Sequence, residues 1–374
     1  MEIHPVKTRK QWKCFHALPR RLYSGSSEWI QPLRLQTRQT WAPRHPFFKH
    51  SSAAAWLAWR DGEPVGRISA QVDALDAECG RSGAGHFGQL EGVDDSSVFR
   101  SLVAAAERWL IERGVTEVTG PFDLSINQQC GLLVDGFEHP PMMMMTYNPP
   151  HYPRRIEALG FEPAAETLAY RGSPRYQLPV RVARLLSRMQ DRLEIRPVAR
   201  AELESHAESM RLIFNAAWSD NWGFVPFTED EFAHAIGEMK FLIRPGYVNL
   251  AEVDGELAGF IVVLPDLNEL ISDLDGRLFP FGGPRLLWRL ARRRSRRARI
   301  PLMGVVPEYQ QSFVGAAVSY ALIEAARHSI VRDGIEITEQ SWILANNQGM
   351  RSMVESIGME VAQRFCIYRK TLAG

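Results

Sequence analysis

The chain has 374 residues, of which 45% are hydrophobic and 23% charged, and its formal net charge is +1. These values fit a globular protein with room for two domains, and they exclude binding to polyanions through overall charge. None of the four cysteines lies in a C-x-x-C pair, and no His-x-x-x-His pattern occurs. We therefore expect neither a dithiol redox motif nor a metal site.

The N-terminal residues, Met-Glu-Ile-His-Pro-Val, have no apolar core of the kind found in secretory signals. No apolar run approaches the roughly 18–20 residues that a membrane-spanning helix needs. We expect a cytoplasmic protein that lies, at most, on the surface of the inner membrane.

Three segments of the first half recur in the second half, in the same order. Glu2–Val6 matches Glu194–Val198, Trp56–Gly66 matches Asn249–Gly259, and Leu159–Glu162 matches Ile357–Glu360. The spacing between partners is nearly constant, at 192 to 198 residues. Such order and spacing indicate a duplicated unit.

Each copy has the pattern of a mixed α/β fold. An opening strand and a helical stretch lead to a hairpin, whose Asp-Gly pair (Asp61-Gly62 or Asp254-Gly255) supplies the positive φ of a tight turn. A long helix follows, over about 96–113 with Ser96 as N-cap in the first copy and over 315–332 in the second. A strand, a short helix ending at Gly160 or Gly358, and a closing strand complete each copy.

These elements predict an N-terminal domain over 1–172, a linker with a connecting helix over 173–192, and a C-terminal domain over 193–374. Each copy has one insertion that the other copy lacks. The first copy has an insertion over 120–150, and the second has a basic insertion over 265–300.

The element order resembles that of the GNAT superfamily of acyl-CoA N-acyltransferases. In that family a motif of the form V-x-P-x-x-[RQ]-G-x-G-x-[GA] ends a strand, and its backbone amides hold the CoA pyrophosphate at a helix N-terminus. The similar segment here runs from Val305 to Ala317. The resemblance implies a cofactor-binding loop, with these residues: Val305, Val306, Gln310, Gln311, Phe313, Val314, Gly315 and Ala316.

Three departures from the family pattern bear on function. Gln311 and Phe313 replace glycines, so their side chains would limit how closely a phosphate approaches. The first copy has Asp94 and Asp95 at the corresponding place, and two carboxylates would repel a diphosphate. Ile156 and Val354 stand where the family's general-acid tyrosine is expected, which puts that mechanism in doubt for both copies.

A second resemblance, over nearly the whole chain, is to the bacterial GNAT-like family that includes bacterial ceramide synthase. The residues that carry it are Gly120–Asn127, Gly131–Phe137, Pro140-Pro141, Tyr147–Pro150, Tyr152, Asn221-Trp222, Pro226, Pro265–Asn268 and Glu339–Leu344. It implies N-acylation of a long-chain amino-lipid base, a step of sphingolipid synthesis, with acyl-CoA as co-substrate and no metal.

Amide formation from a thioester needs a neutral amine and a group that takes its proton. The catalytic candidates are Glu339 and Glu308 in the second copy, and Asp123 and His151 in the first. Candidate substrate residues, taken from both copies, are Asn127, Tyr147, Asn148, Tyr152, Trp222, Ser341, Trp342 and Asn346. Ordinary structural roles remain open for Glu339, as a strand-end charge, and for Asn346, as a helix cap.

The two insertions carry further hypotheses. Met142–Met145 fit either an acyl-chain channel or a packed loop in which methionine fills gaps. Residues 285–299 hold eight arginines interleaved with leucine and tryptophan. That pattern favours an anionic membrane surface over nucleic acid, with CoA's 3′-phosphate and a solvated helix as the other interpretations.

Two alternatives to the long-chain N-acyltransferase stay open. One is an acetyl-CoA-dependent transferase acting on a small amine or peptide. The other is a GNAT-like protein that binds ligands without catalysis, as the missing glycines and tyrosine would allow.

Overall fold

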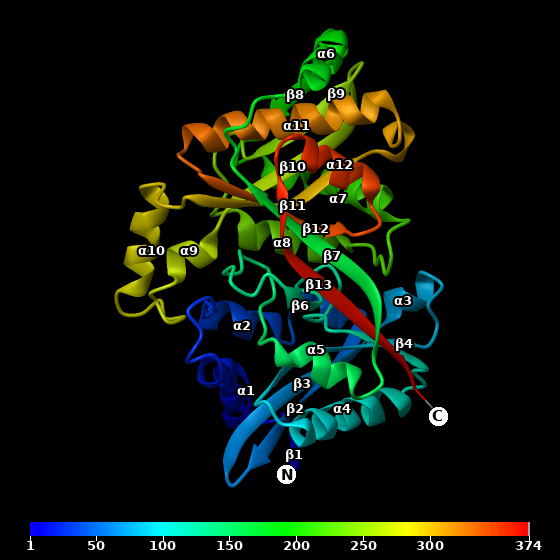
Figure 1. Ribbon diagram of the computed structural model, residues 1–374, viewed down its shortest axis with the longest axis vertical. Coiled ribbons are helices and arrows are strands. Elements are labelled where there is room, and N and C mark those ends of the chain that lie inside the picture. The colour runs from blue at the N-terminus through cyan, green and yellow to red at the C-terminus, as the bar shows by residue number, and fades with distance from the viewer. Residues whose placement is uncertain (373–374) are drawn as a thin grey trace. The chain divides into compact units, whose positions relative to one another are not determined.

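The computed structural model describes residues 1–372 and divides into two compact units (Figure 1). Unit 1 comprises Met1–Thr167, Ile271–Leu278 and the described residues from Gln363 onward. Unit 2 comprises Leu168–Leu270 and Phe279–Ala362. Neither unit is one uninterrupted stretch of sequence.

Unit 1 builds its sheet from six neighbouring strands in the order β1-β2-β3-β4-β5-β13, with β6 also paired to β13. Its strands are β1 (Glu2–Pro5), β2 (Ser51–Arg60), β3 (Glu63–Asp73), β4 (Ala84–Gly92), β5 (Glu117–Gly120), β6 (Leu132–Asp135) and most of β13 (Glu360–Thr371). Its helices are α1 (Arg9–Leu22), α2 (Arg34–Thr40), η1 (Pro46–Lys49), α3 (Ala74–Glu78), α4 (Ser96–Ile111) and α5 (His151–Glu157).

Unit 2 repeats this plan in the order β7-β12-β11-β10-β9-β8. Its strands are the end of β7 (Glu162–Gly172), β8 (Leu193–Pro197), β9 (Val248–Val253), β10 (Glu256–Pro265), β11 (Arg297–Val305) and β12 (Ile337–Leu344). Its helices are α6 (Val180–Met189), α7 (Leu203–Trp218), α8 (Glu229–Met239), α9 (Leu267–Ile271), α10 (Gly282–Ala291), η2 (Pro307–Tyr309), α11 (Phe313–Arg332) and α12 (Gln348–Ser356).

The predicted mixed α/β fold in two tandem copies is therefore confirmed. Both hairpin turns have the expected left-handed backbone, with φ of 51° and 77° at Asp61-Gly62 and 53° and 87° at Asp254-Gly255. The closing strands, β7 and β13, were not predicted in this form, because each starts in one unit and ends in the other. The last strand of the chain pairs with β5 of unit 1, with Tyr368 opposite Gly120.

The long helices start slightly differently from the prediction. Asp95, not Ser96, caps α4, because its carboxylate accepts a hydrogen bond from the Ser97 amide at 2.8 Å. Helix α11 begins at Phe313, two residues before the predicted start, and Ser312 is its cap. Capping oxygens satisfy amides that have no partner within the helix, so they set where each helix begins.

Both long helices pack their apolar faces on the sheet of their own unit. Val98, Phe99, Leu102 and Leu110 of α4 are fully buried in one core cluster. In unit 2, Ala317, Val318 and Leu322 of α11 lie in the core with strand residues such as Ile261. Burial of each large side chain contributes about 1.5–3 kcal/mol, so these faces fix the helices to their sheets.

In each unit two parallel strands pair over a short distance and then part. Strands β11 and β12 pair only from Arg297–Ile300 to Ile337–Gln340, although β11 runs on to Val305 and β12 to Leu344. In unit 1, β4 and β5 pair from Ala84–His86 to Glu117–Thr119. Where strands part, backbone groups on their facing edges lose their ladder partners and become available to a ligand.

Candidate functional site

The start of α11 is the candidate cofactor loop. It consists of residues 306–315, between the end of β11 and the first turn of the helix. The side chain of Ser312 accepts a hydrogen bond from the Gly315 amide at 3.1 Å. Within residues 1–372, the amides of Gln311, Phe313 and Val314 have no hydrogen-bond acceptor. Unpaired amides at a helix N-terminus favour an anion.

The two bulky replacements do not fill this loop. Gln311 has φ of 58°, the left-handed backbone that a glycine would supply, and its side chain is exposed. Phe313 is 64% exposed. Both side chains are therefore exposed to solvent, and Gln311 adopts a backbone conformation typical of glycine, at the cost of local strain.

Gly315 has a packing role. A Cβ built on it would lie 2.1 Å from the Tyr309 carbonyl oxygen, so only glycine lets the η2 turn approach the helix. The other predicted loop residues are held by the framework. The Val306 amide donates to Ala258 O at 2.9 Å, and Gln310 Nε2 donates to Val305 O at 3.0 Å. Ala316 is already in the helical ladder.

Three predicted residues of β12 gather around one buried arginine. Arg299, only 1% exposed, donates from Nε to Ser341 Oγ at 2.9 Å, and its guanidinium lies 4.8 Å from the Trp342 ring centre. Glu339 Oε1 accepts from Ser341 Oγ at 2.7 Å, and its Oε2 accepts from Arg171 Nε at 2.7 Å. This cluster lies at the rungs where β11 and β12 part.

The remaining candidates of unit 2 are Glu308, Trp222 and Asn346, and they lie on other segments than the Arg299 cluster. Glu308 is exposed on η2, and Trp222 is partly exposed in the segment between α7 and α8. Asn346 is exposed, and it is Asn347 that caps α12 by accepting from the Met350 amide at 3.0 Å.

In unit 1 the corresponding helix start is occupied by the chain's own carboxylates. Asp95 accepts from the Ser97 amide and, at 2.6 Å, from Arg60. Hydrogen bonds from Ser97 and then Arg60 lower the pKa of Asp95 to about 2. Asp94 pairs with Arg155 at 2.7 Å. A diphosphate at the N-terminal end of α4 would meet two ionised carboxylates, which supports the prediction that this helix start does not hold CoA.

The insertion over 120–150 is largely packed. Met142, Met143 and Met145 are buried, which favours the packed-loop interpretation of the methionines. Asn148 is 4% exposed and bonds to both the amide and the carbonyl of Leu133, so its side chain serves the framework of β6. The Asn127 amide bonds to Ser125 Oγ at 3.3 Å.

A polar cluster around Glu91 of β4 was not predicted. We name it the Glu91 cluster; its members are Tyr23, Arg67, Glu91, Asp123 and Tyr152. Tyr23 and Tyr152 both donate to Glu91 Oε2 at 2.7 Å, and Arg67 lies 3.6 Å from Oε1. Burial raises the pKa of Glu91 and of Asp123.

The first-copy candidates are related to this cluster to different degrees. Tyr152 and Asp123 belong to it, and the Tyr147 carbonyl oxygen lies 3.1 Å from the Tyr23 hydroxyl. The ring of His151 packs edge-on against Tyr152, with centres 4.8 Å apart, and burial lowers its pKa. A charged residue between glycines in a strand, as in Gly88–Gly92, is the sequence signal that would have pointed to Glu91.

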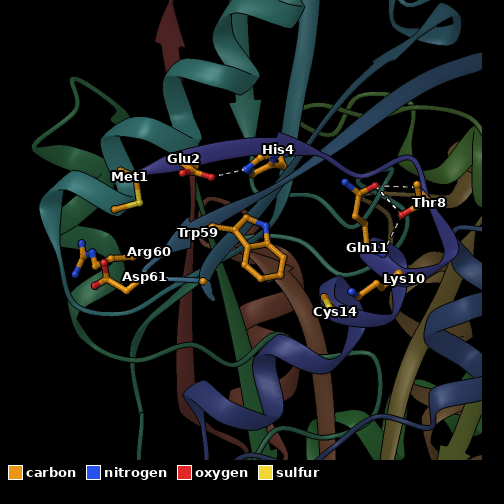
Figure 2. A pocket seen from close by; sticks show the side chains of 11 residues that line it. Met1, Glu2, His4, Thr8, Lys10, Gln11, Cys14, Trp59, Arg60 and Asp61 are labelled. Carbon is orange, nitrogen blue, oxygen red and sulfur yellow. Dashed lines mark hydrogen bonds and ion pairs between the residues drawn. The ribbon is translucent and has the colours of Figure 1, made fainter.

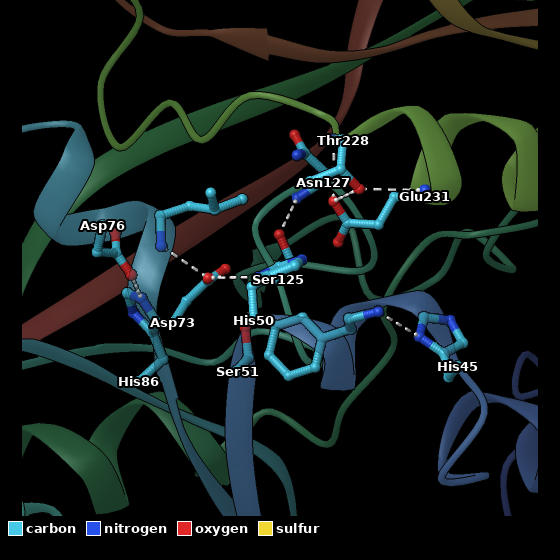
Figure 3. Close-up of polar contacts among 12 residues, drawn as sticks. His45, His50, Ser51, Asp73, Asp76, His86, Ser125, Asn127, Thr228 and Glu231 are labelled. Atoms are coloured by element: carbon cyan, nitrogen blue, oxygen red, sulfur yellow. Dashed lines mark hydrogen bonds and ion pairs between the residues drawn. The ribbon is translucent and has the colours of Figure 1, made fainter.

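Two histidine–carboxylate pairs also lie in unit 1 (Figure 3). His86 bonds to Asp76 at 2.6 Å through Nε2 and to Thr119 at 2.7 Å through Nδ1, tying β4 to β5 at their last rung. His50 Nδ1 contacts both Asp73 and Ser51. A nucleophilic triad needs the acid and the hydroxyl on opposite ring nitrogens, so the His50 group is not one.

A surface pocket of about 600 Å³ lies in unit 1 between β1, the start of α1 and the β2–β3 hairpin (Figure 2). Trp59 lies among its lining residues, with the Glu2–His4 pair on one side and the Thr8–Gln11 capping box on the other. None of the predicted site residues lines this pocket. Its polar groups serve the N-terminal strand and helix, and we assign no ligand to it.

The basic insertion does not form one continuous surface. Arg297 pairs with Asp266 at 2.8 Å, Arg293 pairs with Asp333, and Arg296 pairs with Glu336 at 2.5 Å. With Arg299 buried, at least half of the eight arginines are thus engaged in ion pairs or in the core.

The exposed part of the insertion is α10 and the turn before it. Phe279, Phe281, Leu287 and Trp288 are 87%, 78%, 68% and 49% exposed. Leu286 faces inward, and Arg289 donates to Leu270 O of the neighbouring α9 (Figure 1). Pro284, Arg285, Arg292 and Arg294 are also exposed. Among residues 1–372, no helix is long and apolar enough to span a bilayer.

Comparisons with known proteins agree with this architecture, although no family model matches the chain. It is 13% identical, with a TM-score of 0.59, to a tandem GNAT protein from the clavulanic acid biosynthesis pathway, covering 100% of this chain and 99% of that one. A probable N-acyltransferase from Enterococcus faecalis has a TM-score of 0.51 at 9% identity, covering 99% and 72%. The chain thus has the fold of a tandem GNAT protein.

Two relatives place the chain more narrowly. It is 41% identical over 372 residues to protein YghO of Escherichia coli, covering 99% of this chain and 95% of the relative. It is 39% identical over 376 residues to bacterial ceramide synthase of Caulobacter vibrioides, covering 100% and 98%. The chain belongs to the family that includes these two relatives, and it has the fold of tandem GNAT proteins.

Proposed function

We propose that this protein transfers a long-chain acyl group from acyl-CoA to the amine of a long-chain base, as a bacterial ceramide synthase-like enzyme. The full-length similarity to a protein of that name supports the proposal. The sphingolipid role and the choice of acyl-CoA are parts of the proposal.

The observation that carries it is the α11 loop beside the parted strands of unit 2. The amides of Gln311, Phe313 and Val314 suit a pyrophosphate, and the stretches of β11 and β12 beyond their last shared rung suit the extended arm of an acyl-CoA. Loop amides that are already fixed need no reorganisation when the anion binds, which favours affinity.

The candidates for the base that takes the amine's proton are Glu339, Glu308, Asp123 and His151. Both carboxylate oxygens of Glu339 are engaged by Ser341 and Arg171, and protonation would leave two buried arginines facing a neutral acid. This geometry favours a framework role for Glu339 over the role of the base.

A membrane surface is the proposed source of the acceptor. A long-chain base partitions into lipid, and α10 with its preceding turn offers exposed aromatic side chains next to arginines. Aromatic residues insert at the headgroup level, and arginines pair with anionic lipids, each worth about 1 kcal/mol near the surface.

The test uses the purified chain with a sphingoid base and acyl-CoAs of increasing chain length. Release of free CoA thiol and the mass of the amide product are followed together. The proposal expects a ceramide-like product and faster turnover with long-chain acyl-CoA. Faster turnover with acetyl-CoA would favour the small-amine acetyltransferase, and acyl-CoA binding without turnover would favour the non-catalytic alternative.

A further inference from the structure

The charges around Arg67 in unit 1 do not balance. Two carboxylates, Glu91 and Asp123, act on this one guanidinium. The neighbouring His16 adds no charge near neutral pH, because burial and then the nearby arginines lower its pKa to about 4. With both carboxylates ionised, the Glu91 cluster carries one surplus negative charge. A charge with so little access to water is costly unless a cation joins it or one carboxyl group takes up a proton, and burial raises the pKa of both Glu91 and Asp123.

Arg67 neutralises its partners loosely. It is 8% exposed, and Nη1 donates to Phe15 O at 2.9 Å. The 3.6 Å between Nη2 and Glu91 Oε1 exceeds the length of a hydrogen bond. Its Nε is buried and has no acceptor within the described chain. A site that was only a structural ion pair would be expected to close these contacts.

Glu91 has one oxygen committed and one available. Oε2 accepts hydrogen bonds from the Tyr23 and Tyr152 hydroxyls, whereas the charged donor nearest to Oε1 is Arg67, 3.6 Å away. Asp123 is arranged similarly, because Gln89 donates to its Oδ1 at 2.6 Å. The Glu91 side chain keeps 13% exposure, and Asp123 is partly exposed, so neither side chain is fully closed off from solvent.

The backbone of β4 is bent to present these groups. Arg67 lies opposite Glu91 and Ser69 opposite Gly88, so β4 carries a bulge at Gln89 and Leu90. Gln89 has φ of 47°, a left-handed conformation that costs a non-glycine residue free energy. Bulges and strained residues of this kind re-aim side chains and gather at functional sites.

We propose that Glu91 and Asp123 form a binding site in unit 1 for the primary ammonium group of the acceptor, an assignment that rests on the proposed function. An ammonium supplies one positive charge and three donors, which matches the surplus charge and the available carboxylate oxygens. Tyr23 and Tyr152 are positioning residues that hold the Glu91 carboxylate in place.

The binding test compares hexadecylamine with hexadecanol in detergent micelles, using the full chain and calorimetry. We expect the amine to bind at least tenfold more tightly than the alcohol. Glu91→Gln and Asp123→Asn should each remove most of that preference and leave the affinity for long-chain acyl-CoA unchanged. Glu107→Gln, which breaks the half-buried pair with Lys370 elsewhere in unit 1, is the matched control and should behave as wild type.

A second variant keeps the proposal falsifiable if Glu91→Gln does not fold. Tyr23→Phe removes a hydrogen bond from the tyrosine hydroxyl to the Glu91 carboxylate, so it destabilises the ionised carboxylate and raises the pKa of Glu91 further. Amine binding weakens as pH falls through that pKa, and in Tyr23→Phe the weakening should begin at a higher pH. A merely structural role for Tyr23 would leave the pH at which binding weakens unchanged.

The outcomes separate the inference from the proposed function. Glu91-dependent amine selectivity without any amide product would remove the proposed reaction and keep the binding site. Amide formation together with wild-type amine affinity in folded Glu91→Gln and Asp123→Asn would overturn the site and keep the reaction. Equal losses for amine and alcohol would also overturn it, because the carboxylates would then not recognise the charge.

Discussion

Glu339 Oε2 accepts a hydrogen bond from Arg171 Nε at 2.7 Å, and neither side chain is more than 12% exposed. Arg299 lies on the other side of the same carboxylate, with its Nε 3.8 Å from Oε1. The buried Glu339 carboxylate thus neutralises two arginines, Arg171 of β7 and Arg299 of β11. Its removal leaves their charges facing each other without compensation.

Glu339→Gln should therefore act first on stability. We expect a loss of about 3–5 kcal/mol in the free energy of unfolding, measured by urea denaturation. Glu336→Gln, which removes an exposed partner of Arg296 in the segment leading to β12, is the control and should change little. Unchanged stability of Glu339→Gln combined with lost turnover would instead return Glu339 to a catalytic role.

Gly315→Ala tests the packing of the α11 loop. The new methyl group would lie 2.1 Å from the Tyr309 carbonyl oxygen, so η2 must move away from the helix. We expect a destabilisation of about 1–3 kcal/mol and weaker acyl-CoA binding in calorimetry. Gly237→Ala is the matched control, because a Cβ built on Gly237 meets nothing within 4 Å. This substitution should stabilise α8 by about 0.5–1 kcal/mol. Wild-type acyl-CoA affinity in Gly315→Ala would show that the loop is not the site.

Gln311→Gly tests whether the bulky replacement hinders the anion. Its φ of 58° is free of strain for glycine, and the side chain it removes is exposed. We expect acyl-CoA affinity at or above the wild-type value, measured by calorimetry, with the protein still folded. A tenfold loss of affinity would mean that the Gln311 side chain itself contacts the ligand.

Much of the fold was predictable because its signals are local. The Asp61-Gly62 and Asp254-Gly255 pairs fix two hairpins by turn chemistry, and the repeated segments show the duplication. The crossing of β7 and β13 between the units was not predictable. Both closing strands carry the same Tyr-Arg ending, at Tyr170-Arg171 and Tyr368-Arg369, so the pattern does not say which unit each strand completes.

The site was predictable only where it follows one stretch of chain. The α11 loop is continuous in sequence, and its motif points to an anion at the helix start. The Glu91 cluster draws on segments far apart, since Tyr23 and Glu91 are 68 residues apart along the chain. Charged residues at Arg67 and Glu91 look like the solvent-facing side of ordinary strands until their cross-strand partnership is known.

The Asp95 cap gives a pH-dependent prediction. Its pKa is lowered to about 2 in the folded chain, so the ionised form is favoured by folding. This stabilisation is complete above the unfolded pKa of roughly 4 and is lost as pH falls through about 2. Asn also caps helices, so Asp95→Asn removes mainly the charge. The difference in unfolding free energy between wild type and variant should shrink between pH 4 and pH 2. A difference that stays constant with pH would show that charge is not the cause.

The exposed face of α10 gives the prediction for membrane binding. Trp288 lies on it and Phe281 directly precedes the helix, with the Arg294 guanidinium 5.1 Å from the Trp288 ring centre. Phe281→Ser with Trp288→Ser should cut binding to vesicles containing anionic phosphatidylglycerol at least tenfold in co-sedimentation, because each side chain loses its apolar contact with lipid. Charge reversal at Arg292 and Arg294 should weaken binding to anionic vesicles and remove its salt dependence, without affecting the weaker binding to neutral phosphatidylcholine. Leu212→Ser on α7 is the matched control, because that side chain is 54% exposed outside the basic insertion. Equal losses in the control and in the α10 variants, or wild-type binding in the α10 variants, would assign any membrane contact to another surface.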